Sequence, residues 1–329
     1  MKILIIGYSN LFKNRIIPIL DRLPIIKEIH VAKFEEQKWD ECIDSINKRV
    51  FKYDNYDDAL KSADVDLAYI SSVNSDHFKS AKASLNRDLH TIIDKPATLK
   101  LSELNTLLKI SESKNLLLAE STVYLYHPQF EEMKSIFCEK YSHVNVVNAI
   151  FSFPILKNDF RYKKELGGGA INDTGSYAAS LARYFFKEVP KSIYCSKIMD
   201  EESSLELAYT ILMEFSKNRS LLGHFGFLTE YVNQINLLGP HLFISADRVF
   251  TIPENKSQRL NIKTDNKEYV VEVTARNNFL TFFKEIFSAL ENKNYEKFRK
   301  DMYMDGLILD KIRKSARDKN YRNFLFYNK

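Results

Sequence analysis

The sequence predicts an α/β protein in two parts: an N-terminal Rossmann-type parallel sheet, then a C-terminal α+β domain with a large, mostly antiparallel open sheet. Over residues 1–130, short β-branched runs alternate with amphipathic, helix-like segments, which is typical of a parallel sheet covered on both faces. The rhythm changes near residue 144, where strand-like runs begin to follow one another without helices between them.

The first part opens with KILIIG at residues 2–7, which indicates a buried strand. NRIIPILDRL at residues 14–23 follows as a predicted helix, with Pro18 near its first turn. We expect further strands at 28–34, 67–72, 90–94 and 116–121, and helices at 75–88 and 101–114. A parallel sheet of this kind binds ligands at the carboxyl ends of its strands.

The second part begins with a long strand at residues 144–154 and contains one helix at about 170–186. The later strand-like runs have hairpin spacing and lie at 192–198, 205–216, 220–227, 233–239, 242–246 and 269–274. Two predicted helices follow at 279–293 and 302–318, and we expect them to pack back near the first part.

The composition is that of an ordinary soluble globular protein, because 45% of the 329 residues are hydrophobic and 28% are charged. The 48 basic and 43 acidic residues are spread along the chain, so we expect no nucleic-acid partner. No apolar stretch approaches the roughly 20 residues that span a bilayer, which argues against a membrane protein. Cys42, Cys138 and Cys195 are widely spaced, so we expect no metal site and no disulfide, and a cytoplasmic location.

The turn after the first strand keeps part of a dinucleotide-binding fingerprint. That fingerprint, G-x-G-x-x-G, lets the backbone approach a pyrophosphate at a helix N-terminus. Here Gly7 is kept, whereas Ser9 and Phe12 replace the second and third glycines. Ser9 can still donate hydrogen bonds to a phosphate from its hydroxyl and from its backbone N–H. Phe12 either holds the helix further from the strand or fills a gap between them. An ordinary glycine turn at a strand end is the alternative.

The end of the second strand bears on the choice of cofactor. An acid there holds the ribose hydroxyls of NAD, whereas a cation suits the 2′-phosphate of NADP. The sequence places Lys33 at this position and therefore favours NADP(H) over NAD(H). Glu35 and Glu36 follow closely, so a small shift of the alignment would reverse the preference.

Lys95 stands between Asp94 and Pro96 at the end of a predicted buried strand, where an open α/β sheet keeps its active site. A cis peptide is common only before proline, and a cis bond at Pro96 would turn the lysine into the cleft. The alternative is an exposed lysine at a strand end, which is the usual environment of lysine.

A triple glycine precedes the predicted helix in GGGAINDTGSYAASLARYFF, residues 167–186. Asp173 and Tyr177 are four residues apart and share a stripe beside the apolar face, continued by Ser180 and Tyr184. The glycines allow close approach to another backbone or to a ligand. Alternatively, Asp173 only complements the helix dipole and Tyr177 is a core residue.

Taken together, these segments resemble a known enzyme family. DLAYISSVNSDHFKSAKASLNRDLHTIIDKPATL is similar to the cofactor-domain core of the glucose–fructose oxidoreductase / inositol dehydrogenase / MocA (Gfo/Idh/MocA) family, whose hallmark is E-K-P. AESTVYLYHPQFEEMKSI and DFRYKKELGGGAINDTGSYAASLARYFF resemble the branch with dihydrodiol dehydrogenase and sugar-nucleotide ketoreductases. LGPHLFISADRVFTIP (238–253) is similar to the family's pattern near the end of its sheet, so the resemblance covers nearly the whole chain.

The resemblance implies roles for individual residues. Lys95 matches the lysine that contacts substrate and nicotinamide, Tyr177 the proton donor or acceptor of this branch, and Asp173 the acid one turn earlier. The complete set of predicted cofactor contacts is Gly7, Ser9, Asn10, Leu11, Lys33, Ser72, Val73, Asn74, His77, Asp94, Pro96 and Arg161. The predicted substrate contacts are Tyr124 and Asn172.

Three positions depart from the family's pattern. Asp94 replaces the glutamate of E-K-P, Val73 stands where proline is usual, and Leu125 stands where this branch often has arginine. Together with the lost glycines, these changes leave open weak cofactor affinity or an inactive relative.

The resemblance implies an NAD(P)-dependent oxidoreductase that transfers hydride between nicotinamide and a hydroxyl or ketone carbon of a sugar or sugar nucleotide. The alternatives are a polyol or dihydrodiol dehydrogenase, and a catalytically impaired member that binds a sugar or a partner. Residues 1–122 would form the dinucleotide-binding domain, and residues 123–329 would bind substrate and pair subunits. We expect a homodimer or homotetramer through the exposed face of the open sheet, rich in Phe, Tyr and Leu.

Overall fold

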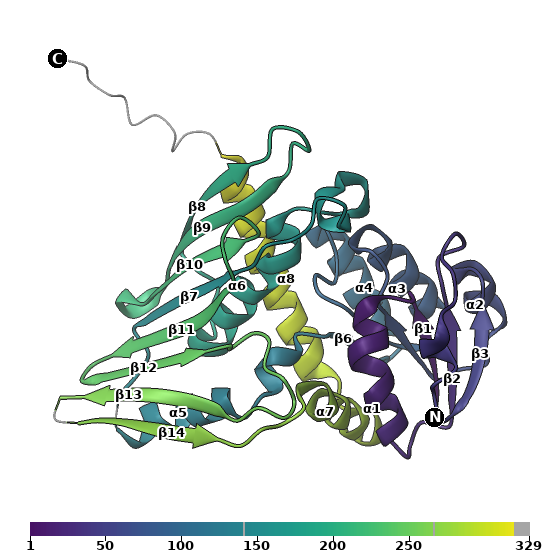
Figure 1. Ribbon diagram of the computed structural model, residues 1–329, viewed down its shortest axis with the longest axis horizontal. Helices are drawn as coiled ribbons and strands as arrows, with labels where there is room; N and C mark the ends of the chain where they lie inside the picture. Colours follow the sequence, from purple (N-terminus) through teal and green to yellow (C-terminus); the bar gives the residue numbers. More distant parts are fainter. Residues whose placement is uncertain (141, 266, 319–329) are drawn as a thin grey trace.

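The computed structural model describes residues 1–140, 142–265 and 267–318 and contains two β-sheets (Figure 1). The predicted fold class is confirmed, because one sheet is parallel and the other is larger and mostly antiparallel. Among the residues just given, no helix is long and apolar enough to cross a membrane.

The first sheet has six parallel strands in the order β3-β2-β1-β4-β5-β6. Its strands are β1 Lys2–Ile6, β2 Glu28–Ala32, β3 Arg49–Tyr53, β4 Leu67–Ile70, β5 His90–Ile93 and β6 Leu118–Glu120. The order reverses between β1 and β4, so the carboxyl ends of these two strands border the crevice in which such sheets bind ligands.

Helices cover both faces of this sheet because successive side chains of a strand point in opposite directions. Ile3 and Ile5 share an apolar cluster with α1 and α7, whereas Leu4 and Ile6 pack with α2, α3 and α4. These helices are α1 Ile17–Arg22, α2 Tyr56–Ser62, α3 His77–Asn86, α4 Leu101–Ser113 and α7 Asn278–Asn292.

The second sheet has eight strands in the order β14-β13-β12-β11-β7-β10-β9-β8, and every pairing is antiparallel except that of β7 with β10. Its strands are β7 Val146–Ser152, β8 Ser192–Met199, β9 Glu206–Glu214, β10 Ser220–Gly226, β11 Val232–Gly239, β12 Leu242–Asp247, β13 Gln258–Thr264 and β14 Glu268–Val273.

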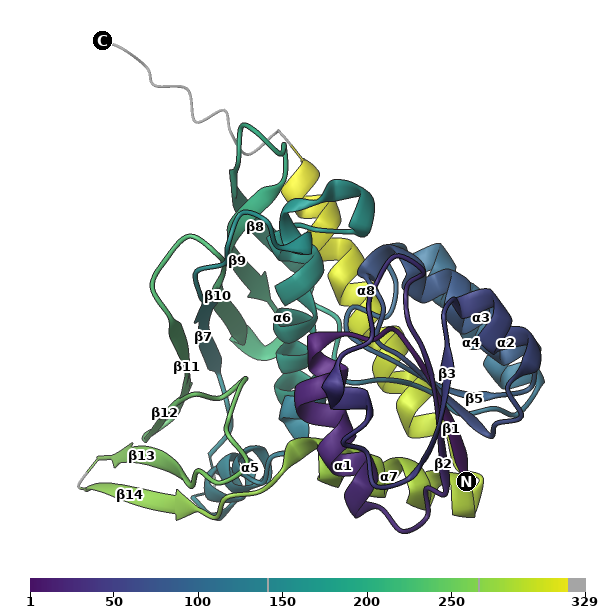
Figure 2. The same ribbon diagram turned by 45° about the vertical axis from the view of Figure 1, so that its right-hand side comes forward.

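One face of the second sheet packs on three helices: α5 Gln129–Glu139, α6 Ala170–Phe186 and α8 Glu296–Arg317. Figure 2 shows α6 and α8 between the two sheets. Ile308 and Ile312 of α8 lie in the core of the second part, while Met302 of the same helix lies in the core of the first. A single helix therefore contributes to both cores and ties the two parts together.

Among the described residues, the strands β3 and β13 and the α-helices α2 and α5 were not predicted. In RVFKY (β3) and QRLNIKT (β13), charged or polar residues interrupt the apolar ones, so neither shows the continuous apolar run of a buried strand. The predicted helix 14–23 also differs, because a π-helical turn, Phe12–Ile16, precedes α1. Helix α8 begins at Glu296 rather than at residue 302.

Candidate active site

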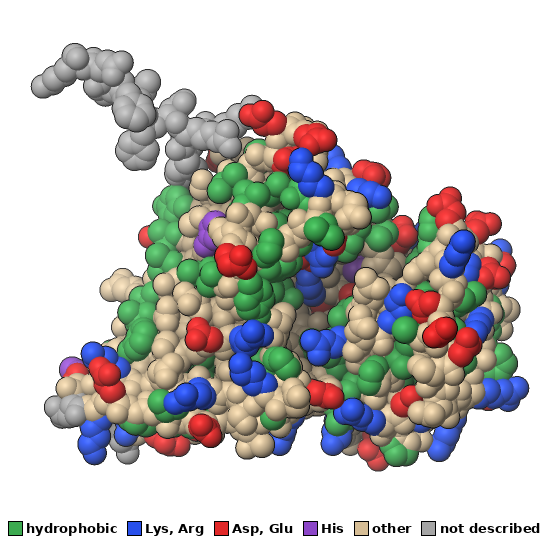
Figure 3. Space-filling model, in the orientation of Figure 1, with side chains coloured by type: hydrophobic (Ala, Val, Ile, Leu, Met, Phe, Trp, Pro, Cys, Tyr) green, Lys and Arg blue, Asp and Glu red, His purple; other side chains and the backbone are tan. Residues whose placement is uncertain are grey.

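A cavity of about 910 Å³ lies at the carboxyl ends of the parallel strands, between the first sheet and α6. Figure 3 shows a hollow between the two halves of the molecule, with basic side chains at its edge. The predicted residues that line the cavity are Gly7, Ser9, Asn10, Leu11, Ser72, Val73, Asn74, His77, Asp94, Lys95, Tyr124, Arg161, Asp173 and Tyr177. The structure thus brings together two walls that lie far apart in the sequence.

Gly7 leads from β1 into the turn at one end of the cavity. Its φ of 112° is rarely adopted by residues with a side chain, and a Cβ atom there would lie 2.4 Å from the carbonyl oxygen of Ser71. The backbone N–H of Gly7 donates to the carbonyl of Ala32 at 2.9 Å. This glycine therefore lets β1 and β4 approach closely at the point where a cofactor's phosphates would enter.

Ser9 does not hold its hydroxyl ready for a phosphate, contrary to our expectation. Its Oγ atom lies 2.7 Å from the Oγ of Ser71 and accepts the backbone N–H of Phe12 at 3.0 Å. Phe12 is fully buried in the apolar cluster of α1, so it fills the gap that a third glycine would close. The side chains of Ser9 and Phe12 therefore stabilise the turn at the positions where the fingerprint has its second and third glycines.

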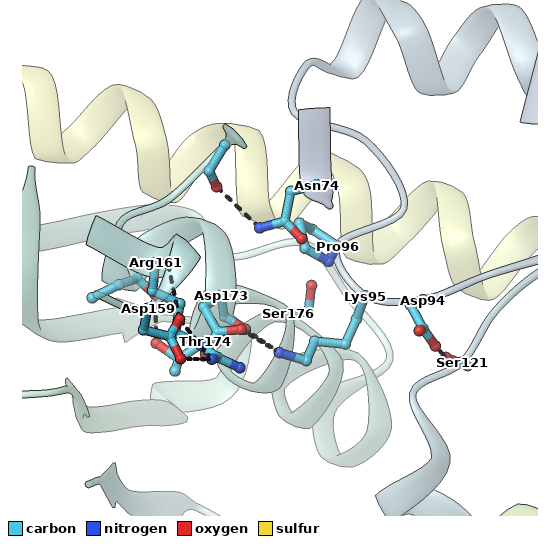
Figure 4. A network of polar contacts seen from close by, with 12 residues as sticks. Asn74, Asp94, Lys95, Pro96, Ser121, Asp159, Arg161, Asp173, Thr174 and Ser176 are labelled. Atoms are coloured by element: carbon cyan, nitrogen blue, oxygen red, sulfur yellow. Dashed lines mark hydrogen bonds and ion pairs between the residues drawn. The ribbon is translucent and has the colours of Figure 1, made fainter. Parts of the chain in front are cut away.

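Asp94 is tied into a group of hydroxyls. Its carboxylate accepts hydrogen bonds from Tyr69, from Ser71 at 2.6 Å and from Ser121 at 2.7 Å. These residues come from the ends of β4 and β6, on either side of β5. Asp94 therefore holds three strand ends and, through Ser71, the turn at Ser9. Figure 4 shows it directed away from its neighbour Lys95.

Lys95 points into the cavity and contacts α6 (Figure 4). Its Nζ atom lies 2.8 Å from Oδ1 of Asp173 and 2.7 Å from the carbonyl oxygen of the same residue. The same atom lies 5.1 Å from the centre of the Tyr177 ring. The Lys95–Pro96 peptide bond is cis. The structure therefore places the two residues predicted to carry the chemistry beside each other.

Asp173 is shared by two cations. Its Oδ2 atom lies 3.0 Å from Nε of Arg161, whose guanidinium also donates to Asp159 at 3.1 Å. Burial would raise the pKa of Asp173, but Lys95 and Arg161 outweigh it and hold the pKa at about 2. Burial would likewise lower the pKa of Lys95, yet Asp173 raises it above its ordinary value. Both groups are therefore charged at neutral pH.

Tyr177 presents a partly buried phenol to the cavity. Its ring packs edge-on against Tyr124 and Phe151. Burial raises the pKa of Tyr177, and the nearby Lys95 offsets only part of this rise. A nearby cation alone would bring the pKa of Tyr177 closer to neutrality, but loss of solvation is the larger effect here.

The loop of Asn74 and His77 lies against both the triple glycine and the turn at Pro96. Asn74 donates from Nδ2 to the carbonyl of Gly167 at 3.0 Å, and this bond joins the two parts of the chain. The His77 ring contacts the carbonyl oxygens of Pro96 at 2.8 Å and of Ser72 at 3.1 Å. These contacts fix the part of the cavity wall that Asn74 and His77 form.

Three predicted site residues, Lys33, Pro96 and Asn172, do not line the cavity. The ammonium of Lys33 is paired with Asp54 at 3.0 Å, so it is held by a neighbouring loop. Pro96 is buried and its carbonyl accepts from His77. Asn172 faces α8 instead, where its Oδ1 atom accepts hydrogen bonds from Arg313.

Several lining residues were not predicted. Phe34 follows β2 directly and is half exposed at the cavity, so its position after the strand was a usable signal. Other lining residues come from separate helices and loops and carried no such signal, among them Gln37, Tyr56, Phe160, Phe250 and Phe279. The cavity is thus more aromatic than the motifs suggested, which suits flat rings such as those of a nucleotide.

Two family models match the chain. One is described as "Oxidoreductase family, NAD-binding Rossmann fold" and matches residues 1–122, and the other as "GFO/IDH/MocA C-terminal domain" and matches residues 140–242. Both match in the order in which the two sheets follow each other.

Similar proteins are known in bacteria. A dTDP-3,4-didehydro-2,6-dideoxy-α-D-glucose 3-reductase from Saccharopolyspora spinosa is 29% identical over 200 residues, which cover 60% of each chain. A reductase of the same name from Actinomadura kijaniata is 22% identical over 328 residues, which cover 95% of each chain. A solved 3-ketoreductase from Actinomadura kijaniata, in complex with NADP and TDP-benzene, has a TM-score of 0.89 at 20% identity and covers 97% of this chain and 98% of its own. The last comparison shows the same fold.

Proposed function

The chain belongs to the Gfo/Idh/MocA oxidoreductase family, and we propose that it transfers hydride between NADP(H) and a hydroxyl or ketone carbon of a nucleotide-linked sugar. The observation that carries this proposal is the contact of Lys95 with Asp173 and Tyr177 inside the cavity at the carboxyl ends of the parallel strands. A cation can stabilise the negative charge that develops on the oxygen of a ketone during hydride transfer, and a phenol can donate the proton.

The residues of the cavity fit a nicotinamide cofactor. The cavity reaches from Phe34, after β2, past the turn at Gly7 to Tyr177, so it can hold an extended dinucleotide. The backbone of Gly7 lies so close to Ser71 that a Cβ atom at Gly7 would collide with it, so only glycine fits in this turn. When bound, the cofactor would supply or accept the hydride at the end of the cavity near Lys95.

Lys95 would act on the oxygen of the substrate. In the reducing direction negative charge develops on that oxygen, and a preorganised ammonium stabilises it. Asp173 keeps the ammonium charged and aimed into the cavity, since the pKa of Lys95 is raised by this partner. Arg161, on the other side of Asp173, shares the negative charge, so that Lys95 is not fully neutralised by its own partner.

Tyr177 would hold and deliver the proton. Because burial raises its pKa, the phenol is protonated at neutral pH, as a proton donor to an alkoxide must be. Among the described residues its hydroxyl makes no hydrogen bond, so it is available to a ligand in the cavity.

The preference for NADP(H) is supported by the solved ketoreductase, which holds NADP, and not by Lys33, which is paired with Asp54. The nucleotide-linked sugar is supported by the names of the two reductases, both of which act on a dTDP-linked sugar. The enzyme would act in the cytoplasm.

A binding protein without activity is the second candidate, favoured by one observation. The hydroxyl of Ser9 is already used within the turn, and two fingerprint glycines are missing, so cofactor affinity is the weakest part of the proposal. A polyol or dihydrodiol dehydrogenase is the alternative within the same chemistry.

The test begins with cofactor binding. Trp39 is the single tryptophan, and its ring lies 5.0 Å from that of Tyr8, which lines the cavity. Titration with NADPH and with NADH should quench Trp39 fluorescence, NADPH at lower concentration. Oxidation of NADPH would then be followed with dTDP-3,4-didehydro-2,6-dideoxy-α-D-glucose, with a free ketose such as D-fructose, and with a dihydrodiol ketone. If neither NADPH nor NADH binds, the proposed enzymatic activity is wrong. If the enzyme reduces only the free sugar or only the dihydrodiol ketone, the proposal of a nucleotide-linked substrate is wrong.

We also propose pairing of subunits through the open face of the second sheet. The paired residues Tyr194, Leu212 and Leu222 stand in register across β8, β9 and β10 and point to the same side, and two of them are about two-fifths exposed. Asn148 and Asn236 continue this row, so the face is less aromatic than we expected. An apolar row of this kind suits an interface between two copies.

A further inference from the structure

We propose that Glu120 and Arg313, which lie outside the cavity, form a clamp that positions Lys95 against α6. This inference rests on the proposed function, in which Lys95 and Tyr177 act on the substrate. It assigns a positioning role to two residues that no motif identified. They reach the same turn from two sides, one from the end of β6 and the other from α8.

Glu120 connects the turn after Lys95 with α6. Its Oε1 atom accepts the backbone N–H of Ala97 at 3.1 Å and the hydroxyl of Ser176 at 3.2 Å. Ala97 comes two residues after Lys95, and Ser176 lies on α6 between Asp173 and Tyr177 (Figure 4). One oxygen atom therefore holds the segment that carries Lys95 and the helix that carries its two partners.

The sheet fixes where Glu120 can act. Glu120 on β6 pairs in register with Ile93 on β5, which lies two residues before Lys95. The backbone of Glu120 therefore lies beside the end of the strand that leads to Lys95. The N–H of Ala97 is a buried donor that needs an acceptor once the chain has turned away from β5. Strand β6 ends at Glu120, and the backbone carbonyl of Glu120 already accepts the N–H of Thr122 at 2.9 Å. The carboxylate thus supplies the acceptor that the ladder lacks.

Arg313 makes the second half of the clamp. Its guanidinium donates to Oδ1 of Asn172 at 3.0 and 3.2 Å, and to the carbonyl of Thr98 at 3.4 Å. Thr98 follows Ala97 in the same turn, and Asn172 precedes Asp173 on α6. Arg313 is 9% exposed, so these bonds form away from solvent. This explains why Asn172 does not line the cavity: it is a strut between α6 and α8.

The hydrogen bonds of Glu120 need an oxygen and not a charge. Burial raises the pKa of Glu120 to about 7, so a neutral side chain at this place is compatible with the fold. Glutamine keeps the accepting oxygen, whereas leucine keeps the volume and removes both bonds. Glu120→Gln and Glu120→Leu therefore separate positioning from packing.

The test measures the accessibility of the Lys95 amine, without any substrate. The folded protein is treated with trinitrobenzenesulfonate, and the rates of labelling at Lys95 and at Lys33 are compared by peptide mass spectrometry. Lys33 is an internal control, because its side chain is also largely shielded, at 7% exposed against 21% for Lys95, and is also paired with an acid, Asp54. We expect Glu120→Leu and Arg313→Met to raise the Lys95 to Lys33 ratio several-fold and Glu120→Gln to leave it nearly unchanged.

The kinetic consequence should appear in kcat. With NADPH and the dTDP-linked keto sugar, Glu120→Leu should lower kcat by up to about 100-fold with little change in KM, since small displacements of a reacting group have effects of that size. Glu188→Leu is the control for stability, because Glu188 bonds Ser216 and Arg219 far from the turn. It should lower the melting temperature and leave the labelling ratio unchanged.

A wild-type labelling ratio in folded Glu120→Leu and Arg313→Met overturns the clamp. So does a parallel rise at Lys95 and Lys33, which would indicate general loosening. If the ratio rises as expected while Lys95→Ala retains full activity, the clamp stands and the proposed function fails. The two failures are therefore distinguishable.

Discussion

The Nζ atom of Lys95 lies 2.8 Å from Oδ1 of Asp173, although the two residues are 78 positions apart in the chain. One stands just after β5 of the parallel sheet, and the other lies in the first turn of α6. Their contact brings the cation of one segment beside the phenol of the other, since Tyr177 follows Asp173 by one turn. The predictions below test what this contact does.

Lys95→Ala should lower kcat by about 100- to 1000-fold, because the developing charge on the substrate oxygen loses its preorganised partner. Fluorescence titration with NADPH should show nearly unchanged affinity. Lys100→Ala is the matched control, since Lys100 lies on the same connection but is exposed and paired only with Glu103. Full activity of Lys95→Ala with the true substrate would show that the lysine has no chemical role.

Tyr177→Phe should lower kcat by about 100- to 10,000-fold, because the ring packing is kept and only the proton is lost. The melting temperature should change little. Tyr184→Phe, two turns further along α6, is the control: its hydroxyl bonds Glu131 at 2.7 Å outside the cavity. Equal losses in both variants would mean that the effect comes from the helix and not from proton transfer.

Asp173→Asn should destabilise the protein by about 3–5 kcal/mol at neutral pH, because Lys95 and Arg161 lose a buried partner. The pKa of Asp173 is about 2 in the folded state, below its value of about 4 when unfolded, so its contribution is present above pH 4 and lost as the pH falls to 2. Melting curves from pH 7 to pH 2 should therefore show the wild type and the variant converging at the acid end. If the difference in melting temperature between the wild type and Asp173→Asn does not shrink as the pH falls, the lost stability comes from a group other than the Asp173 carboxylate.

Lys33→Ala should change the ratio of NADPH to NADH affinity by less than about two-fold, because the ammonium of Lys33 is already paired with Asp54 and does not reach the cavity. The ratio is measured by quenching of Trp39, with Lys52→Ala as a control near the same indole. A ten-fold loss of NADPH affinity alone, about 1.4 kcal/mol, would show instead that Lys33 leaves Asp54 to bind the 2′-phosphate.

Leu222→Asp should convert an oligomer into a monomer in size-exclusion chromatography with light scattering. Leu222 is 42% exposed and stands in register between Leu212 and Asn148 on the open face of the second sheet. A buried carboxylate at an interface costs several kcal/mol. Leu156→Asp is the control, since Leu156 is 77% exposed in a loop and not on the sheet. A monomeric wild type would contradict the proposed interface.

Most of the fold followed from local patterns. The β-branched runs of β1, β4 and β5 and the stripe of α6 are signals that adjacent residues carry by themselves. The edge strand β3 was not predicted because its polar residues face solvent and interrupt the apolar pattern. Pro96 and Asn172 were expected at the cavity and do not line it, because a motif does not state which way a side chain points. The same reason explains the missed Phe250, which reaches the cavity from a distant loop, and Phe279, which reaches it from the start of α7.

Residue types and spacings within single segments are enough to predict the two-part fold, the family and the candidate residues Lys95, Asp173 and Tyr177. The contact of Asp173 with Lys95, the pairing of Lys33 with Asp54 and the raised pKa of Tyr177 become visible only in the folded chain. These outcomes depend on burial and on the balance of solvation against nearby charges. That balance is set by segments that meet only when both sheets and α8 have packed together.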